Sequence, residues 1–565
     1  MNRINKVSQL QDTSTIDVYF LTIVMLFFGS LIIRLVAAAK LPLNAFESAL
    51  LMNNPGGLAA WENPISLIES VLIKTTYLVF GQTQLGARLW PALAGSILVT
   101  IPLYLKEMLG KKLSLILGLL LAIEPFLLAN SLQVGSNIFA ILGLTIFLAA
   151  LVKVDKPLTM IGALILLLSG RGLFPSLVLI TILYLFHRNI HALYRIRFEK
   201  ADIKNIGYSS RIQLAGAVFI AALVVSLLKI DLSSLLATIS AYFPQTINPY
   251  FRHATNKGLP VVLLSYAPLI ISIFVIFCFR YLTRTKTFVM ILLIAVIALS
   301  LWIIIMPDKN YLDLVWVTLP MLIGCAYYLS ELLVQENNPS GLVMFLISII
   351  LIISLFGSFS QFIYQGRYGL SQGNSLITMV IIIFLLIFFY FAFLAFGSDT
   401  QFLRVTGLSL LVVVSVMQIS FSFRAAGFTR NVSHELLLSG AIADADIVMR
   451  TVEIRSIARQ SVDNNVQIGV EAGLSPQLGW ILKNENVYLF PSGASGPLSL
   501  DIVLTKENTI QINRKYVGQS MTADVYPKWI ETPISSLFDY DYWSWLFFRN
   551  SNIVKATHHI WYAMD

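Results

Sequence analysis

Residues 404–422, RVTGLSLLVVVSVMQISFS, form the last long apolar run of the chain, and residues 443–460, ADADIVMRTVEIRSIARQ, begin sequence of a different kind. Before the boundary near residue 423, apolar runs recur that are long enough to cross a bilayer, which takes about 20 apolar helical residues per crossing. After the boundary the stretches are mixed and water-soluble. The boundary therefore predicts a membrane domain over residues 1–422 and a soluble domain over residues 423–565.

The composition excludes a soluble globular protein. Of the 565 residues, 57% are hydrophobic and 12% are charged, and the mean hydropathy is +0.77. Soluble domains contain about twice that share of charged residues. We expect an α-helical polytopic membrane protein of about 13 spans. We place them at residues 17–39, 85–105, 113–130, 137–153, 157–170, 173–186, 213–230, 259–280, 287–306, 312–330, 341–363, 376–396 and 404–422.

The basic residues predict the orientation. The net charge of +9 would suggest a nucleic-acid partner in a soluble protein, but here it is concentrated in three loops, 105–112, 187–211 and 279–286, so no such partner is expected. All three fall on the side of the N-terminus, where Arg3 and Lys6 lie, and the positive-inside rule makes that side cytoplasmic. We therefore expect an integral protein of the plasma membrane, with the first span retained. Segments 40–84, 131–136, 231–258 and 307–311 then lie outside, together with the soluble domain.

The first external segment, 40–84, is too long for a simple connection. Its apolar stretch ISLIESVLIKTTYLVFG, residues 65–81, carries Glu69 and Lys74. These polar positions favour a helix that lies at the interface or re-enters the membrane. In the alternative, residues 64–81 span the bilayer and the sidedness of every later loop reverses. The distribution of the basic loops argues against that alternative.

The soluble domain shows helix, strand and turn signals in one small unit. Residues 443–460 predict a helix, segments 465–472, 485–490, 499–505 and 515–521 predict strands, and GLSPQ and PSGASG predict turns. We expect a small α/β or α+β domain outside the cell. Both cysteines, Cys278 and Cys325, fall in predicted spans, which leaves this domain without a disulfide or a cysteine-ligated zinc site. We expect the aromatic terminal segment 540–565 at a headgroup boundary or a domain interface.

Two acids stand in the first external segment. Glu47, in LNAFESALL, follows the first span, and Glu62, in WENP, comes fifteen residues later. An acid that acts at a membrane surface should lie near the headgroups, where it avoids the cost of full burial. By themselves, both are also consistent with solvated loop carboxylates.

The run from Leu43 to Asn137 resembles the N-terminal part of membrane glycosyltransferases of the GT-C class, in particular the polyprenyl- or dolichyl-phosphate-sugar-dependent protein mannosyltransferase-like and RgtA/B/C/D-like proteins. The resemblance rests on the order of the elements FES (46–48), ENPI (62–65), FG (80–81) and ARLWPALAG (87–95). Residues 309–322, KNYLDLVWVTLPML, are similar to the start of a late span in that class. The likeness covers about the first 155 residues, and a weaker one extends to GLSPQLGWILKN and RKYVGQS in the soluble domain.

The resemblance implies transfer of a sugar from a polyprenyl-phosphate-linked donor to a protein, lipid or glycan acceptor on the outer face. Glu47 would deprotonate the acceptor or help to hold a metal ion, with Glu62 as a second catalytic candidate. Arg88 and Arg171 would neutralise the carrier phosphate, and Asn63 and Asn137 would bind substrate. An arginine at a span end can equally reach the headgroups with no further role.

Two departures from the class pattern affect this interpretation. In the second external loop, Leu132 stands at the position of an arginine and Asn137 at that of an acid. Asn137 can orient a hydroxyl but cannot act as a base. The resemblance leaves open whether the reaction depends on a divalent metal. These two changes argue against such a dependence. Two alternatives also stay open, a transporter of lipid-linked oligosaccharide and an inactive relative that binds glycolipid.

Overall fold

The computed structural model describes residues 18–563 with internal gaps. The gaps are residues 42, 45–46, 49–50, 52–65, 187–258, 283–285, 306–310, 333–338, 397–408, 410–411, 414, 424–444, 460–465, 472–473, 475, 484, 492–499, 507–515, 528–541, 545 and 547–552. The predicted span 213–230, residues 404–408, 410–411 and 414 of the span 404–422, and the external loop 231–258 lie outside the described residues.

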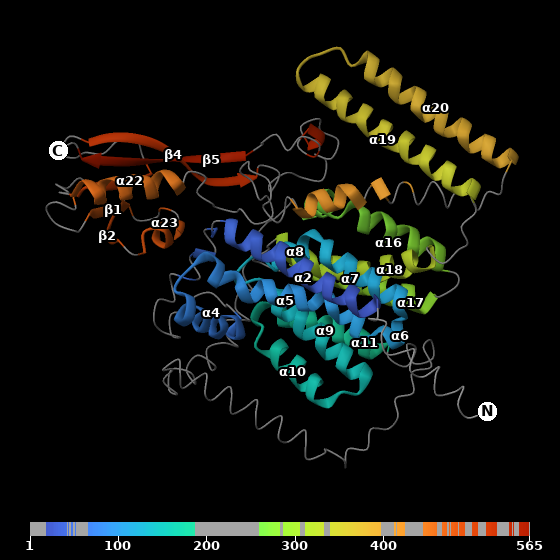
Figure 1. Cartoon of the computed structure of the whole chain (residues 1–565), viewed down its shortest axis with the longest axis horizontal. Helices are drawn as coiled ribbons and strands as arrows, with labels where there is room; N and C mark the ends of the chain where they lie inside the picture. Colours follow the sequence, from blue (N-terminus) through green and yellow to red (C-terminus); the bar gives the residue numbers. More distant parts are fainter. Residues whose placement is uncertain are drawn as a thin grey trace, which may run out of the picture.

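The part of the membrane domain that is described is helical (Figure 1). Its elements are α2 (Val18–Lys40), α4 (Leu67–Phe80), α5 (Gln84–Tyr104), α6 (Lys106–Leu109), α7 (Lys111–Ile123), α8 (Pro125–Asn130), α9 (Ile138–Lys153), α10 (Lys156–Leu167), the 3₁₀ turn η1 (Gly170–Gly172), α11 (Leu173–Leu185), α15 (Leu259–Tyr266), α16 (Pro268–Tyr281), α17 (Lys286–Ile305), the 3₁₀ turn η3 (Tyr311–Leu314), α18 (Val315–Leu332), α19 (Pro339–Arg367) and α20 (Gly373–Phe396).

Among these helices, 5 are long and apolar enough to cross a membrane one by one, and a bent pair makes up to 6. Several shorter apolar helices, such as α9 and α11, accompany them. This confirms a mostly helical membrane protein, while the number of about 13 spans stays a prediction. The helix α4 has 14 residues and is not among the candidate spans. It fits the helix expected at the interface.

One predicted span is sharply bent. Residues 259–280 were predicted as one span, and the structure divides them into α15 and α16, which meet at an angle of 88°. The break falls at Ala267, whose φ of −120° and ψ of 37° leave the helical region. Pro268 follows it, and a proline both lacks the N–H that would continue the helix and disfavours helical geometry in the residue before it. The local sequence thus explains the bend.

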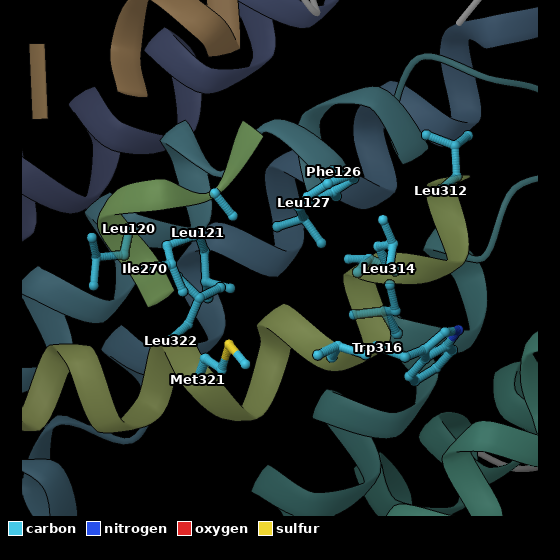
Figure 2. Close-up of a cluster of buried hydrophobic side chains, with 14 of the residues drawn as sticks. Leu120, Leu121, Phe126, Leu127, Ile270, Leu312, Leu314, Trp316, Met321 and Leu322 are labelled. Atoms are coloured by element: carbon cyan, nitrogen blue, oxygen red, sulfur yellow. The ribbon is translucent and has the colours of Figure 1, made fainter. Parts of the chain in front are cut away.

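The core of the bundle is apolar and closely packed. Figure 2 shows side chains from α7, α8, α16, η3 and α18 that meet in one layer, among them Leu121, Phe126, Ile270 and Trp316. Elsewhere in the bundle, a partly open apolar pocket of about 250 Å³ is lined by α5, α6, α7, α9, α11, α17 and α18. In Figure 1, α19 and α20 lie side by side beyond this bundle, and many of their large apolar side chains are exposed, as lipid-facing helices require.

The helices α4 and α5 are placed against each other by local signals. Ser66 and Thr83 cap them, each accepting a hydrogen bond from the N–H three residues further on. Gly81, with a φ of 72°, ends α4 in a conformation that glycine adopts without strain. The indole N–H of Trp90 donates to the Thr76 hydroxyl at 2.5 Å, which ties the two helices together. This packing brings a polar face of α4 toward the start of α5.

The soluble domain is a five-stranded mixed sheet with the order β2-β1-β3-β5-β4 and two helices. Its elements are α22 (Ala445–Arg459), β1 (Gln467–Glu471), α23 (Pro476–Ile481), β2 (Asn486–Phe490), β3 (Ile502–Thr505), β4 (Tyr516–Pro527) and β5 (Ile553–Ala563). The strands β2 and β3 pair parallel to β1, whereas β5 pairs antiparallel to β3 and β4. The predicted helix and the four predicted strands are all present.

Two expectations for this domain need correction. The segment GLSPQ, interpreted as a turn, leads into α23, because Pro476 occupies the first helical position, where its missing N–H costs nothing. Residues 553–563 form strand β5 inside the sheet. Only the preceding part of the terminal segment lies at a domain interface. There the Tyr542 hydroxyl is 2.9 Å from that of Ser265, and the ring of Trp543 is 5.4 Å from that of Phe359.

Candidate functional site

The first candidate acid, Glu47, is held by its own segment. The N–H of Glu47 donates to the Asn44 side chain at 2.8 Å, and the N–H of Asn44 donates to Glu47 Oε2 at 3.0 Å. This reciprocal pair has the geometry of a capping box. Glu47 is 0% exposed. The expectation that it would avoid full burial is therefore wrong, and the reason is the partner that it meets on α5.

That partner is Arg88, which is also buried, in the second turn of α5. Its Nε donates to Glu47 Oε1 at 2.8 Å and its Nη2 donates to Glu47 Oε2, so the ion pair is bidentate. Its Nη1 donates to the Leu41 carbonyl at 2.5 Å. The charge of Glu47 is thus compensated inside the protein, which makes its burial tolerable.

A second buried carboxyl lies beside this pair. Glu69 stands in the first turn of α4 and is 0% exposed. Its Oε1 accepts a hydrogen bond from the N–H of Gly135 at 3.0 Å, and its Oε2 has no hydrogen-bond partner among the described residues. Burial raises the pKa of the Glu69 carboxyl to about 8, helped by the nearby charge of Glu47 and opposed by the Gly135 hydrogen bond. We refer to Glu47, Glu69 and Arg88 as the carboxyl cluster.

The turn between α8 and α9, residues 131–137, binds both carboxyls through its backbone. The N–H of Val134 donates to Glu47 Oε1 at 3.0 Å, and the next N–H, that of Gly135, donates to Glu69. Successive N–H groups in a turn create a concave site for anions. Gly135 has a φ of 75°, a region that a residue with a side chain enters only at a cost. The 131–137 turn therefore binds both carboxyl groups through backbone N–H groups and contributes no charged residue of its own.

The same turn ends in a second polar group, the amide cluster of Asn130, Ser136, Asn137 and Asp313. The Asn137 side chain donates to Asp313 Oδ1 at 2.7 Å, and the Asn137 N–H donates to the Asn130 side chain at 3.1 Å. Asn130 also donates to the carbonyls of Phe126 and Leu312, at 2.8 and 2.9 Å. A carboxylate is thus present beside Asn137, brought there by η3 from a distant part of the sequence.

The turn η1 packs against this amide cluster. A Cβ atom on Gly172 would lie 2.2 Å from that of Ala140 and 3.3 Å from Asn137 Oδ1, so only glycine permits this approach. The backbone of Arg171 therefore runs close to Asn137. The side chain of Arg171 lies outside the described part of the structure, and its role stays a prediction.

The soluble domain touches the helix that carries Glu69. The ring of Trp480 on α23 lies 6.4 Å from that of Tyr77 on α4, and Lys483 Nζ donates to the carbonyl of Gln82. The Tyr77 hydroxyl is buried and has no hydrogen-bond partner among the described residues. The soluble domain thus packs against the membrane domain at the end where the carboxyl cluster lies (Figure 1).

The structure brings together some of the predicted site residues. Glu47 and Arg88 form one pair, and Asn137 lies at the other end of the same turn, whereas Glu62 and Asn63 fall in the gap 52–65. No group of three or more potential metal ligands of the His, Cys, Asp or Glu type occurs in the described residues. A further buried acid, Glu124, caps α8 by accepting from the Leu127 N–H.

Two site residues were not predicted, namely Glu69 and Asp313. Glu69 did carry a local signal, because it stands three residues after Ser66, as a first-turn acid does when a serine caps the helix. Asp313 lies within the quoted segment KNYLDLVWVTLP, yet nothing in its neighbourhood points to Asn137. Pairings over 176 positions along the chain leave no trace in a single sequence.

Comparison with known proteins gives distant similarities only. No family model matches the sequence, and no curated protein matches it. The crystal structure of ArnT from Cupriavidus metallidurans bound to undecaprenyl phosphate is similar over 83% of this chain and 86% of that chain, with 15% identity and a TM-score of 0.44. The apo state of the same protein is similar over 82% and 85%, with 15% identity and a TM-score of 0.42.

At such identities and TM-scores, these similarities to ArnT carry no conclusion about the class or the reaction of this protein, which have to follow from the site itself.

Proposed function

We propose that this protein transfers a sugar from a polyprenyl-phosphate-linked donor to an acceptor at the outer face of the membrane. The observation that carries the proposal is the carboxyl cluster, in which three ionisable side chains are buried together at one end of an apolar helical bundle. Ionisable groups are expensive inside a membrane protein, and where they occur they generally mark the site of function. The order of the GT-C-like elements between Leu43 and Asn137 supports the same assignment.

The chemistry of such a transfer suits this arrangement. Positive charge develops at the anomeric carbon while the phosphate leaves with its electron pair, so the site must hold fixed charges of both signs. Glu47 and Arg88 supply one of each. Because Glu47 already accepts two hydrogen bonds from Arg88 and one each from the N–H groups of Asn44 and Val134, its negative charge is held in one place. Its role as a base or metal ligand would require one of these bonds to break.

The remaining binding roles follow the sequence resemblance. Arg171, Asn63 and Asn137 bind the phosphate or the sugar in this proposal, and Glu62 is a second acid near Glu47. An amide such as Asn137 can donate to a sugar hydroxyl once it exchanges its bond to Asp313. The donor is presented from the lipid phase, which is consistent with the apolar surface of the surrounding helices.

A second candidate function is binding of glycolipid without turnover. It is favoured by the same hydrogen bonds that fix Glu47, since every one of its bonds is compatible with a purely structural ion pair. The asparagine at position 137 points in the same direction, because an amide cannot replace a catalytic acid.

The test is turnover of labelled polyprenyl-phosphate sugars by the full chain reconstituted in liposomes, with release of polyprenyl phosphate as the readout. We expect turnover by the wild type and a loss of about 100- to 10,000-fold in Glu47→Gln, the range in which general-base or charge-stabilising groups contribute. Glu107→Gln is the matched control, because that glutamate is 74% exposed in a different loop, and its turnover should be unchanged. Donor binding without turnover by the wild type would favour the second candidate.

A further inference from the structure

The two carboxyl groups of the carboxyl cluster differ in how many hydrogen bonds their oxygen atoms accept. Both oxygens of Glu47 are engaged, each by one donor from Arg88 and one backbone N–H. Glu69 uses one oxygen to accept from the N–H of Gly135, and the other has no hydrogen-bond partner among the described residues. A buried polar atom without a partner is costly, so each one calls for an explanation, and a catalytic role is one of them.

We propose that Glu69 is a catalytic residue, the base that takes the proton of a hydroxyl group on the acceptor. This inference deepens the proposed function and rests on it. The Gly135 N–H fixes the orientation of the carboxyl group through Oε1, and Oε2 is the atom that receives the proton. The Glu47–Arg88 pair is then a fixed pair of charges beside the base.

The transfer step balances as follows. The acceptor oxygen forms a bond to the anomeric carbon of the sugar while its proton passes to Glu69 Oε2. The bond between the anomeric carbon and the phosphate oxygen breaks, and its electron pair leaves with polyprenyl phosphate. The carboxylic acid formed on Glu69 returns its proton to water before the next turnover. The step requires no oxidant or reductant.

The surroundings of Glu69 make it a stronger base than an ordinary carboxylate. Burial and the charge of Glu47 both disfavour the ionised form, and the pKa of about 8 lies near the pH at which most proteins work. Below that pH the group is mostly protonated and must lose its proton before it can act. Turnover should therefore rise with pH up to about 8 and level off above it.

The titratable and charged groups that face Glu69 come from few elements. The 131–137 turn contributes backbone N–H groups and no titratable side chain. Glu47, in the segment after α2, acts on Glu69 by its charge, and Arg88 on α5 pairs with Glu47. The helix α4 itself carries Lys74 and Tyr77, and α23, which packs against α4, carries Lys483. Of these, Glu47 is the one that raises the pKa of Glu69 by its charge.

The experiment measures the pH dependence of turnover for the wild type, Glu69→Gln and Glu107→Gln in liposomes. Glutamine has the shape of the protonated carboxyl, so Glu69→Gln should keep the unfolding temperature while turnover falls about 100- to 10,000-fold and loses its dependence on pH. Glu107→Gln should keep the wild-type rate and profile. In the residual activity of Glu47→Gln, the inflection should move to lower pH, because the charge that raises the pKa of Glu69 is gone.

An infrared measurement adds a readout that needs no substrate. The part of the protonated-carboxyl band that disappears as the pH rises through about 8 should be present in the wild type and missing in Glu69→Gln, whereas the part that comes from other buried carboxyls, such as Glu124, should remain in both. A wild type that turns over no donor overturns the proposed function and this inference together. A wild type that turns over donor while Glu69→Gln remains as active, or a rate that falls as the pH rises through 8, overturns the inference alone.

Discussion

The carboxyl cluster and the amide cluster are both held by the 131–137 turn, but they carry different amounts of charge. The first buries Glu47 against Arg88 and keeps Glu69 beside them. The second holds the single acid Asp313, which accepts from the Asn137 amide, and Asn137 in turn donates to Asn130. Charged partners in a low-dielectric interior interact strongly and are costly to separate, whereas amides exchange partners at a small cost. The comparison indicates that the carboxyl cluster fixes charge and that the amide cluster fixes the position of the turn.

The largest loss in the free energy of unfolding is expected when the Glu47–Arg88 ion pair is broken. Arg88→Met leaves Glu47 buried without its counter-charge, which should lower the free energy of unfolding by about 3–5 kcal/mol. The double variant Glu47→Met/Arg88→Met should recover most of that loss, because no buried charge remains. Chemical denaturation in detergent micelles measures both. Arg280→Met is the control, since this arginine is exposed, and it should change stability little.

A loss in Arg88→Met no larger than that in the control would show that the pair is not held as described. Failure of the double variant to recover stability would show that packing, and not charge, holds this end of α5.

A smaller effect is expected in the turn that joins the two clusters. Gly135→Ala places a side chain at a φ of 75°, which should cost about 1–2 kcal/mol. Because the N–H of Gly135 binds Glu69, the change should also reduce turnover. Gly357→Ala is the matched control, since a Cβ atom there meets nothing within 4 Å and the residue lies in the helix α19. It should be neutral or stabilising. Equal stability of the two variants would argue against the turn geometry.

The smallest effect is expected in the amide cluster. Asp313→Asn removes a charge but keeps an oxygen that can accept from Asn137, so the free energy of unfolding should fall by only about 0.5–1.5 kcal/mol. The pH profile of turnover should not move. A loss as large as that of Arg88→Met would mean that both clusters depend on charge, and the contrast between them would be lost.

The sequence predicted the fold in outline because that outline is set by local composition. Apolar length predicts helices such as α2 and α17, and alternating patterns predict strands β1 to β4. Pro268 was a local signal for the bend at Ala267. The bend was missed because the spans were predicted from apolar length alone. Strand β5 was missed because its aromatic residues are equally typical of a membrane boundary.

The site was predictable only in part, for a physical reason. Glu47 and Arg88 could be selected one at a time from their places near the ends of apolar runs. Their pairing could not, since it joins residues 41 positions apart through tertiary packing. The same holds for Glu69, whose importance arises from Gly135 and from Glu47 and not from its sequence neighbours.

The position of β5 has a consequence for how the protein is made. In the sheet order β2-β1-β3-β5-β4, the long strand β4 reaches the rest of the sheet only through β5, which follows both β3 and β4 in the chain. During synthesis β4 therefore has no partner in the sheet on either edge until β5, which ends at residue 563, has been made. Unpaired edges of this length invite pairing with other chains. Completion of the chain and closure of this sheet are thus coupled, and a nascent chain stalled before β5 would expose a surface that quality-control factors can recognise.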